Sequence, residues 1–138
     1  MSAEIRVFIK RIDMLNIEQW ISAFSEYGFD LKFDCELDVF KDNGFIPMVY
    51  KGESCGFEYG FDNLEDTMFS IDENQEIAGK DICVSFSSEY DQSNLASAMI
   101  ASAVLVKKCS GIYWIMDSFE LDNDPINMAR NLEENGFE

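Results

Sequence analysis

Apolar and charged residues alternate strictly along residues 31–39, which is the clearest regularity in the chain. Because successive side chains of a strand point to opposite faces, this two-residue period predicts a strand with one buried face and one carboxylate-rich face. Residues 5–10 show the same period, and residues 45–50 and 55–61 are predicted to form two further strands. The turn at residues 41–44 ends in Asn-Gly, so it predicts a tight hairpin between the second strand and the third.

Amphipathic helices are predicted near both ends of the chain. The first should begin after Asn16, which suits a helix N-cap and has a glutamine three positions later to complete a capping box, and should end at Gly28. Its apolar residues recur at intervals of three and four, which places them on one face. The last helix should begin at Asp124-Pro125, an N-cap followed by a proline at the first helical position, and stop near Gly136.

A strand–helix–strand unit is predicted to form the centre of the fold. Residues 82–86 are an apolar strand, and the polar turn at residues 87–91 offers side chains that can cap a helix. Residues 95–106 are almost uncharged and rich in alanine and serine, so they predict a helix that is packed on most of its surface. Gly111 is a plausible helix stop, and residues 112–116 should form the following strand.

The order of these elements predicts an α+β fold. Three consecutive strands and isolated helices between others favour a mostly antiparallel sheet with helices packed on one face. Residues 1–138 are long enough to form a single domain that buries a core without metal or disulfide support. Residues 62–79 lose all periodicity and are predicted to be either a short helix or an extended loop, and residues 119–124 a connector.

The charge of the chain limits its partners. There are 27 Asp and Glu residues against 10 Lys and Arg, a net charge of −17 without any histidine. Such a chain lacks the basic face that phosphate neutralisation needs, so a nucleic-acid binder of that kind is excluded. An anionic membrane surface is disfavoured for the same reason. The charge favours a cationic partner, or serves solubility through self-repulsion.

Few residues suit catalysis, and we expect no catalytic residue, metal or cofactor. Histidine chemistry is absent, and the four cysteines form no C-x-x-C pair for zinc. Cys35 and Cys83 fall at apolar positions of predicted strands, whereas Cys55 is the most exposed candidate for a nucleophile, with a structural role preferred. The N-terminus has no signal-peptide pattern, so we expect reduced thiols in the cytoplasm, with disulfides as the alternative.

An acidic tract between Lys51 and Lys80 stands above this background, because eight carboxylates occur there without one basic residue. Carboxylates steer a cationic partner from a distance, and aromatic side chains at the centre of a contact supply most of the binding energy. The alternative is a solvated acidic loop whose aromatic residues pack inward. The predicted partner-binding residues are Asp62, Glu65, Asp66, Asp72, Glu73 and Glu76 as charge contacts, with Tyr59, Phe61 and Phe69 as anchors.

A family pattern spans roughly residues 45–117. Gly52 and Gly56-Phe57-Glu58 follow a hairpin, the strand Val84-Ser85-Phe86 enters an Ala/Ser-rich helix that ends in Lys-Lys-Cys-Ser-Gly, and a strand runs to Asp117. In this the chain resembles immunity proteins of bacterial contact-dependent inhibition and polymorphic toxin systems. The resemblance implies a non-enzymatic inhibitor that binds one cognate toxin domain, often a nuclease with a basic cleft. Two alternatives stay open, namely an acidic adaptor or nucleic-acid mimic that regulates a basic partner, and a carboxylate-based enzyme.

Overall fold

The computed structural model describes residues 2–136, and its strands form a single sheet in the order β2-β3-β4-β5-β1-β6-β7 with every neighbouring pair antiparallel. This confirms the predicted α+β class. The strands are β1 (Ser2–Ile9), β2 (Leu31–Phe33), β3 (Gly44–Tyr50), β4 (Glu53–Asn63), β5 (Ile82–Glu89), β6 (Ile112–Ile115) and β7 (Ser118–Glu120). The α-helices are α1 (Ile17–Glu26), α2 (Gln92–Cys109) and α3 (Pro125–Asn135), and three short 3₁₀ turns are η1 (Arg11–Asp13), η2 (Leu64–Asp66) and η3 (Gln75–Ile77).

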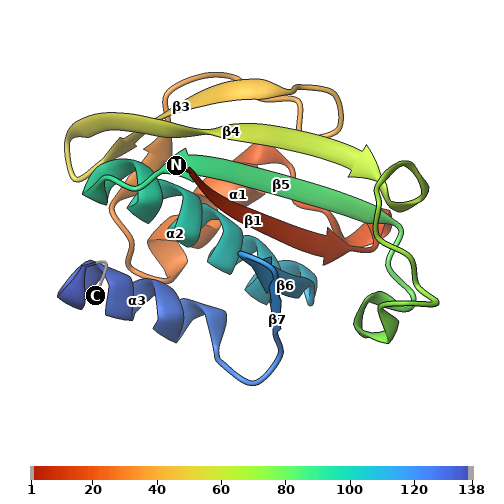
Figure 1. The fold of residues 1–138 in the computed structure, drawn as a ribbon. Helices are drawn as coiled ribbons and strands as arrows, with labels where there is room; N and C mark the ends of the chain where they lie inside the picture. Colours follow the sequence, from red (N-terminus) through yellow and green to blue (C-terminus); the bar gives the residue numbers. More distant parts are fainter. Residues whose placement is uncertain (1, 137–138) are drawn as a thin grey trace.

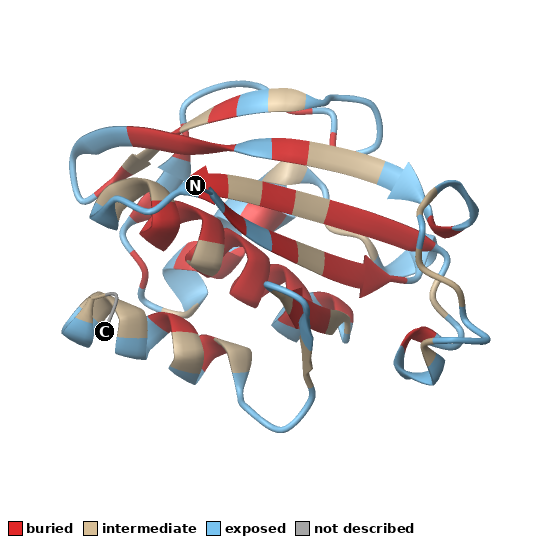
Figure 2. Ribbon diagram, in the orientation of Figure 1, coloured by how far each residue is buried: buried red, intermediate tan, exposed pale blue. Residues whose placement is uncertain are grey.

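All three α-helices lie on one face of the sheet (Figure 1). The strands β5 and β6 pair with the two sides of β1, so α2 crosses over β1 on its way between them. Because α2 contacts the sheet on one side and α1 and α3 on the others, it is buried along most of its length (Figure 2). This explains why its sequence is apolar almost all round instead of amphipathic.

The opposite face of the sheet, which no α-helix covers, has a smaller core of its own. Alternation along β1 separates the two cores: Val7 points toward the helices, while Phe8 points to the helix-free face. The second core consists of Phe8, Leu64, Ile77, Cys83 and Trp114, with Phe69, Ile112 and Phe119 packed against it. Several of these side chains come from the segment between β4 and β5, which therefore folds back onto the sheet.

The helix starts follow the predictions. Asn16 and Gln19 form a reciprocal capping box on α1, with hydrogen bonds of 2.8 Å and 3.0 Å. Asp91 caps α2 by accepting from the backbone N–H of Asn94, and Asp124 caps α3 with Pro125 in the first helical position. Each cap satisfies a backbone donor that the first helical turn leaves without a partner.

The predicted strand over residues 31–39 is wrong beyond Phe33. The backbone N–H of Asp34 donates to the Pro47 carbonyl of β3 over 2.9 Å, but proline has no N–H to return the paired bond. The ladder between β2 and β3 therefore stops, and residues 34–43 form a loop instead of a tight Asn-Gly hairpin. The loop has its own hydrogen bonds, since Asp42 accepts from the N–H of Asp38 over 2.7 Å.

Three other boundaries differ from the sequence-based expectations. The strand β5 continues through Ser87 to Glu89, which were predicted to turn, because these residues pair in register with the start of β1. Part of the predicted connector after β6 is the hairpin strand β7. The helix α2 ends at Ser110, which adopts the left-handed conformation (φ 51°). Gly111, which was predicted to stop the helix, serves a different purpose: without a side chain it leaves room for β1.

Gly56 in β4 tests how tightly the sheet is packed. A Cβ atom there would lie 2.3 Å from the carbonyl oxygen of Ile46 and 2.5 Å from a ring carbon of Phe45. At Gly60 the closest atom is the hydroxyl oxygen of Ser85, at 2.4 Å, and rotation of that side chain can relieve the contact. We expect Gly56→Ala to lower the free energy of unfolding in urea by about 2 kcal/mol or more, and Gly60→Ala by less than about 1 kcal/mol. Equal losses would contradict this packing.

Candidate partner-binding surface

The acidic tract folds into a separate feature of the structure, which we call the acidic lobe (residues 64–80). It lies beyond the end of β4, at the right of Figure 1. Leu64 and Ile77 are buried in the core of the helix-free face. Phe69 packs edge-on against two sheet residues, with ring centroids 4.9 Å from Phe8 and 5.5 Å from Trp114. The lobe is therefore attached to the sheet by apolar contacts at both of its ends and in its middle.

Arg6 contributes a cation to this attachment. Its guanidinium carbon lies 5.4 Å from the ring centroid of Phe69 and 5.8 Å from that of Trp114. Such cation–π contacts are worth roughly 0.5–2 kcal/mol, more when the cation is withdrawn from water. Arg6 is half-buried, so it strengthens the contact between lobe and sheet.

The six carboxylates predicted as charge contacts are all exposed to solvent. None of them takes part in either of the two ion pairs that occur among residues 2–136, Lys107–Asp124 and Lys108–Glu26. Their charges are therefore not neutralised by close basic partners and act outward into solvent. They are Asp62 at the end of β4, Glu65 and Asp66 in η2, Asp72 and Glu73 in the loop, and Glu76 in η3.

The predicted anchors are less accessible than the carboxylates. Tyr59 is only 3% exposed, lies on the helix side of the sheet, and donates its hydroxyl to the Val39 carbonyl over 2.7 Å. Burial raises the pKa of Tyr59 well above its ordinary value. The structure therefore removes Tyr59 from the candidate contacts. Phe61 and Phe69 are half-buried: Phe69 packs inward, and Phe61 packs against Phe40 with ring centroids 5.5 Å apart.

Met68 and Ile71 are the exposed large apolar residues of the acidic lobe, at 89% and 40% exposure. Neither was among the predicted anchors. Thr67 and Phe69 on either side of Met68 are half-buried, and the Thr67 hydroxyl donates to the Leu64 carbonyl over 2.7 Å. Phe69 therefore packs against the sheet while Met68 beside it faces solvent. The sequence carries no signal for this difference, because the chain bends at residues 67 and 68 and follows no strand period there.

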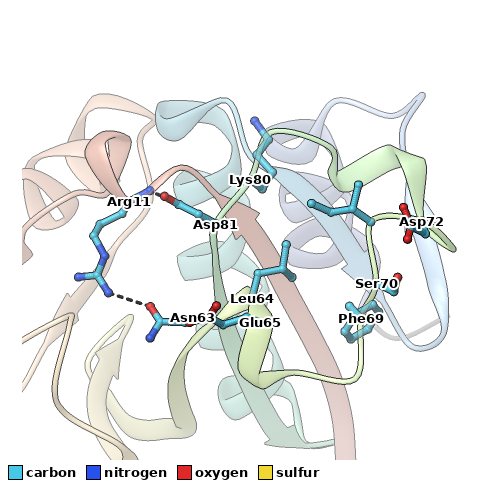
Figure 3. Close-up of a pocket in the computed structure, with 10 residues that line it drawn as sticks. Arg11, Asn63, Leu64, Glu65, Phe69, Ser70, Asp72, Lys80 and Asp81 are labelled. Atoms are coloured by element: carbon cyan, nitrogen blue, oxygen red, sulfur yellow. Dashed lines mark hydrogen bonds between the residues drawn. The ribbon is translucent and has the colours of Figure 1, made fainter.

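A cavity of about 480 Å³ opens between the acidic lobe and η1 (Figure 3). Arg11 closes one side: its backbone N–H donates to Asp81 over 2.6 Å, and its guanidinium donates to the Asn63 side chain over 3.0 Å. The guanidinium also lies 5.2 Å from the ring centroids of Phe40 and Phe61. The lining residues are Arg11, Asn63, Leu64, Glu65, Phe69, Ser70, Ile71, Asp72, Lys80 and Asp81.

The cysteines differ from expectation in their exposure. Cys55 is 9% exposed, so the prediction that it is the most accessible thiol is wrong, and burial raises its pKa. Cys35 lies exposed in the loop after β2, because the strand that would have buried it ends two residues earlier. Burial raises the pKa of Cys83 to about 11, although the neighbouring Arg6 lowers it, and burial raises that of Cys109 to about 11. These shifts disfavour an activated thiolate, which needs a lowered pKa.

Among residues 2–136 no three or more His, Cys, Asp or Glu side chains are grouped to hold a metal ion. In the same part of the chain, no helix has the length and apolar character required to span a bilayer. Comparisons with protein-family models, curated proteins and solved structures find no match to this chain.

Thiol labelling tests this arrangement of the cysteines. At about pH 8 a disulfide reagent should modify Cys35 rapidly and the other three thiols only on unfolding, because they are buried. Partial burial and the carboxylates of Asp34 and Asp42 raise the pKa of Cys35, so its reaction should accelerate as the pH rises further. Release of the reagent's chromophore measures both phases. Cys35→Ser should abolish the fast phase, and a fast phase that survives this substitution would contradict the assignment.

Proposed function

We propose that this protein is a bacterial immunity protein, a non-enzymatic inhibitor that binds a cognate toxin domain in the cytoplasm through the acidic lobe. The observation that carries the proposal is the set of exposed carboxylates without ion-pair partners on a folded lobe. The sequence resemblance over residues 45–117 points to the same class of protein. The expected partner is a toxin domain with a basic surface, most readily a nuclease whose cleft normally holds phosphates.

Charge of this kind acts chiefly on the rate of association. Carboxylates that lack basic neighbours project a negative potential, which attracts and orients a basic partner before contact. The apolar attachment of Leu64, Phe69 and Ile77 to the sheet gives the carboxylates a folded platform. A folded platform loses less conformational entropy on binding than a disordered acidic tail would lose.

Met68 supplies an apolar contact, which adds affinity that charge alone does not provide. Apolar residues at the centre of an interface contribute most of the affinity, while rim charges contribute mainly to rate and specificity. Met68 is almost fully exposed in the middle of the acidic lobe, with Asp66 and Asp72 nearby in the chain. A methionine adapts its shape to a partner's surface because its side chain is flexible and polarisable.

An acidic adaptor or a nucleic-acid mimic would use the same surface toward a basic housekeeping protein. The two functions differ in the partner and in the genetic context, since an immunity gene should lie directly beside the gene of its toxin. Co-expression with the product of the adjacent reading frame therefore separates them. Rescue of growth by this protein supports the immunity function, and lack of any effect on that product's toxicity favours the adaptor.

Charge reversal on the acidic lobe tests the proposal. The triple variant Asp66→Lys, Asp72→Lys and Glu73→Lys should slow association with the toxin domain by about tenfold or more at low salt and flatten the salt dependence of the rate. Stopped-flow or surface-based kinetics over a series of salt concentrations measure both effects. Circular dichroism should show an unchanged fold, because all three side chains are exposed.

A matched control separates local charge from net charge. Asp30, Asp122 and Glu134 are also exposed, make no ion pair among residues 2–136, and lie outside the acidic lobe. Changing these three residues to lysine alters the net charge equally, so it should reduce the association rate much less. If the lobe variant binds as fast and as tightly as the wild-type protein, or if both triple variants lose equally, the acidic lobe is not the binding surface.

A further inference from the structure

We propose that the cavity beside the acidic lobe receives one arginine side chain of the basic partner. This inference rests on the proposed function, and it adds a specific recognition pocket to a surface otherwise described by its charge. The cavity of about 480 Å³ falls within the range of roughly 300–1,000 Å³ that is usual for sites that bind small ligands. This volume is large enough for one long side chain.

The basic residues that line the cavity already have partners. Lys80 donates its ammonium group to the Ser110 carbonyl over 2.9 Å, at the end of α2. The Arg11 guanidinium is held by Asn63 and lies against the rings of Phe40 and Phe61, which are not lining residues. Each basic side chain at the wall is thus held in place by a protein group.

The three carboxylates that line the cavity differ in whether they already have a partner. Asp81 accepts the backbone N–H of Arg11 over 2.6 Å, so one of its oxygens is in use. The carboxylates of Glu65 and Asp72 make no hydrogen bond and no ion pair with any group among residues 2–136. Both line the cavity, from η2 and from the loop after Phe69 (Figure 3). These two unpaired carboxylates favour a cation.

The apolar part of the lining selects a cation with a long stem. Leu64 and Ile71 line the same cavity as the two carboxylates, and Figure 3 shows the side chain of Leu64 between Arg11 and Asp72. Arginine matches this combination, because its methylene groups cover apolar surface while its guanidinium stays with polar groups. Its planar set of N–H donors also pairs with a carboxylate through two parallel hydrogen bonds, which an ammonium group cannot form.

Titration with a small probe tests the pocket without the partner. N-acetyl-arginine methylamide is added to the isotopically labelled protein, and backbone amide shifts are followed by NMR. The expected result is a saturable shift concentrated at Leu64, Ile71 and Lys80. The norleucine analogue, which keeps the stem and lacks the charge, should bind at least about tenfold more weakly, and the lysine analogue should fall between them.

Two double variants provide a control matched in charge and in sequence position. Glu65→Gln with Asp72→Asn removes the two carboxylates of the cavity that have no partner, whereas Asp66→Asn with Glu73→Gln removes their immediate neighbours, which do not line it. The cavity variant should weaken the probe by up to about tenfold, as expected for the loss of ion pairing at exposed carboxylates, and the neighbour variant by less than about twofold. Equal weakening, equal binding of the norleucine analogue, or shifts spread over the whole acidic surface would overturn the pocket.

The outcome of this test differs from that of the proposed function. If the arginine probe does not bind the pocket but the toxin domain still associates in a charge-dependent way, the pocket is wrong and the immunity function stands. If the probe binds at Glu65 and Asp72 but no basic protein binds the lobe, the pocket recognises a free guanidinium compound and the proposed function is wrong. Replacing the partner's arginines one at a time should identify a single arginine that the pocket binds. Once that arginine is replaced, the wild-type protein should bind the partner no more tightly than the Glu65→Gln, Asp72→Asn variant does.

Discussion

The packing of Phe69 against Phe8 and Trp114 is the contact on which the acidic surface depends. The segment between β4 and β5 carries too many carboxylates and too few apolar residues to form a core of its own. It is ordered because the helix-free face of the sheet presents aromatic rings to which Phe69, Leu64 and Ile77 attach. One face of the sheet thus builds the main core with the helices, and the other supports a charged structure that cannot support itself.

The few basic residues near the acidic lobe strengthen this arrangement without neutralising it. Arg6 lies against Phe69 and Trp114, and Arg11 lies against Phe40 and Phe61. Both guanidinium groups therefore stabilise aromatic contacts, and neither forms an ion pair with a carboxylate among the described residues. The molecule keeps its surplus of negative charge, which costs stability through self-repulsion and favours a basic partner by the same electrostatics.

Features of the fold that depend on neighbouring residues were predicted well from the sequence. The predictions failed where pairing between distant segments sets the end of a strand. The caps at Asn16, Asp91 and Asp124 depend on neighbouring residues, so the sequence reveals them. The end of β2 depends instead on Pro47 in the facing strand, which the alternation over residues 31–39 does not show. For the site, the sequence shows where the carboxylates are concentrated, and the structure exposes all six predicted contacts to solvent. Tyr59, predicted as an anchor, is buried instead, because its position in β4 turns it to the helix side of the sheet, which the local pattern does not show.

Native-state hydrogen exchange measures the central claim most directly, namely that the acidic lobe is a folded platform held by Phe69. In the wild-type protein the amides of Asn74, Ile77 and Lys80, which donate to backbone carbonyls within the lobe, should be protected. Phe69→Ala should reduce their protection by at least about tenfold and leave the amides of β1 and β5 protected. Exchange of these lobe amides at unfolded-peptide rates in the wild-type protein would contradict the account.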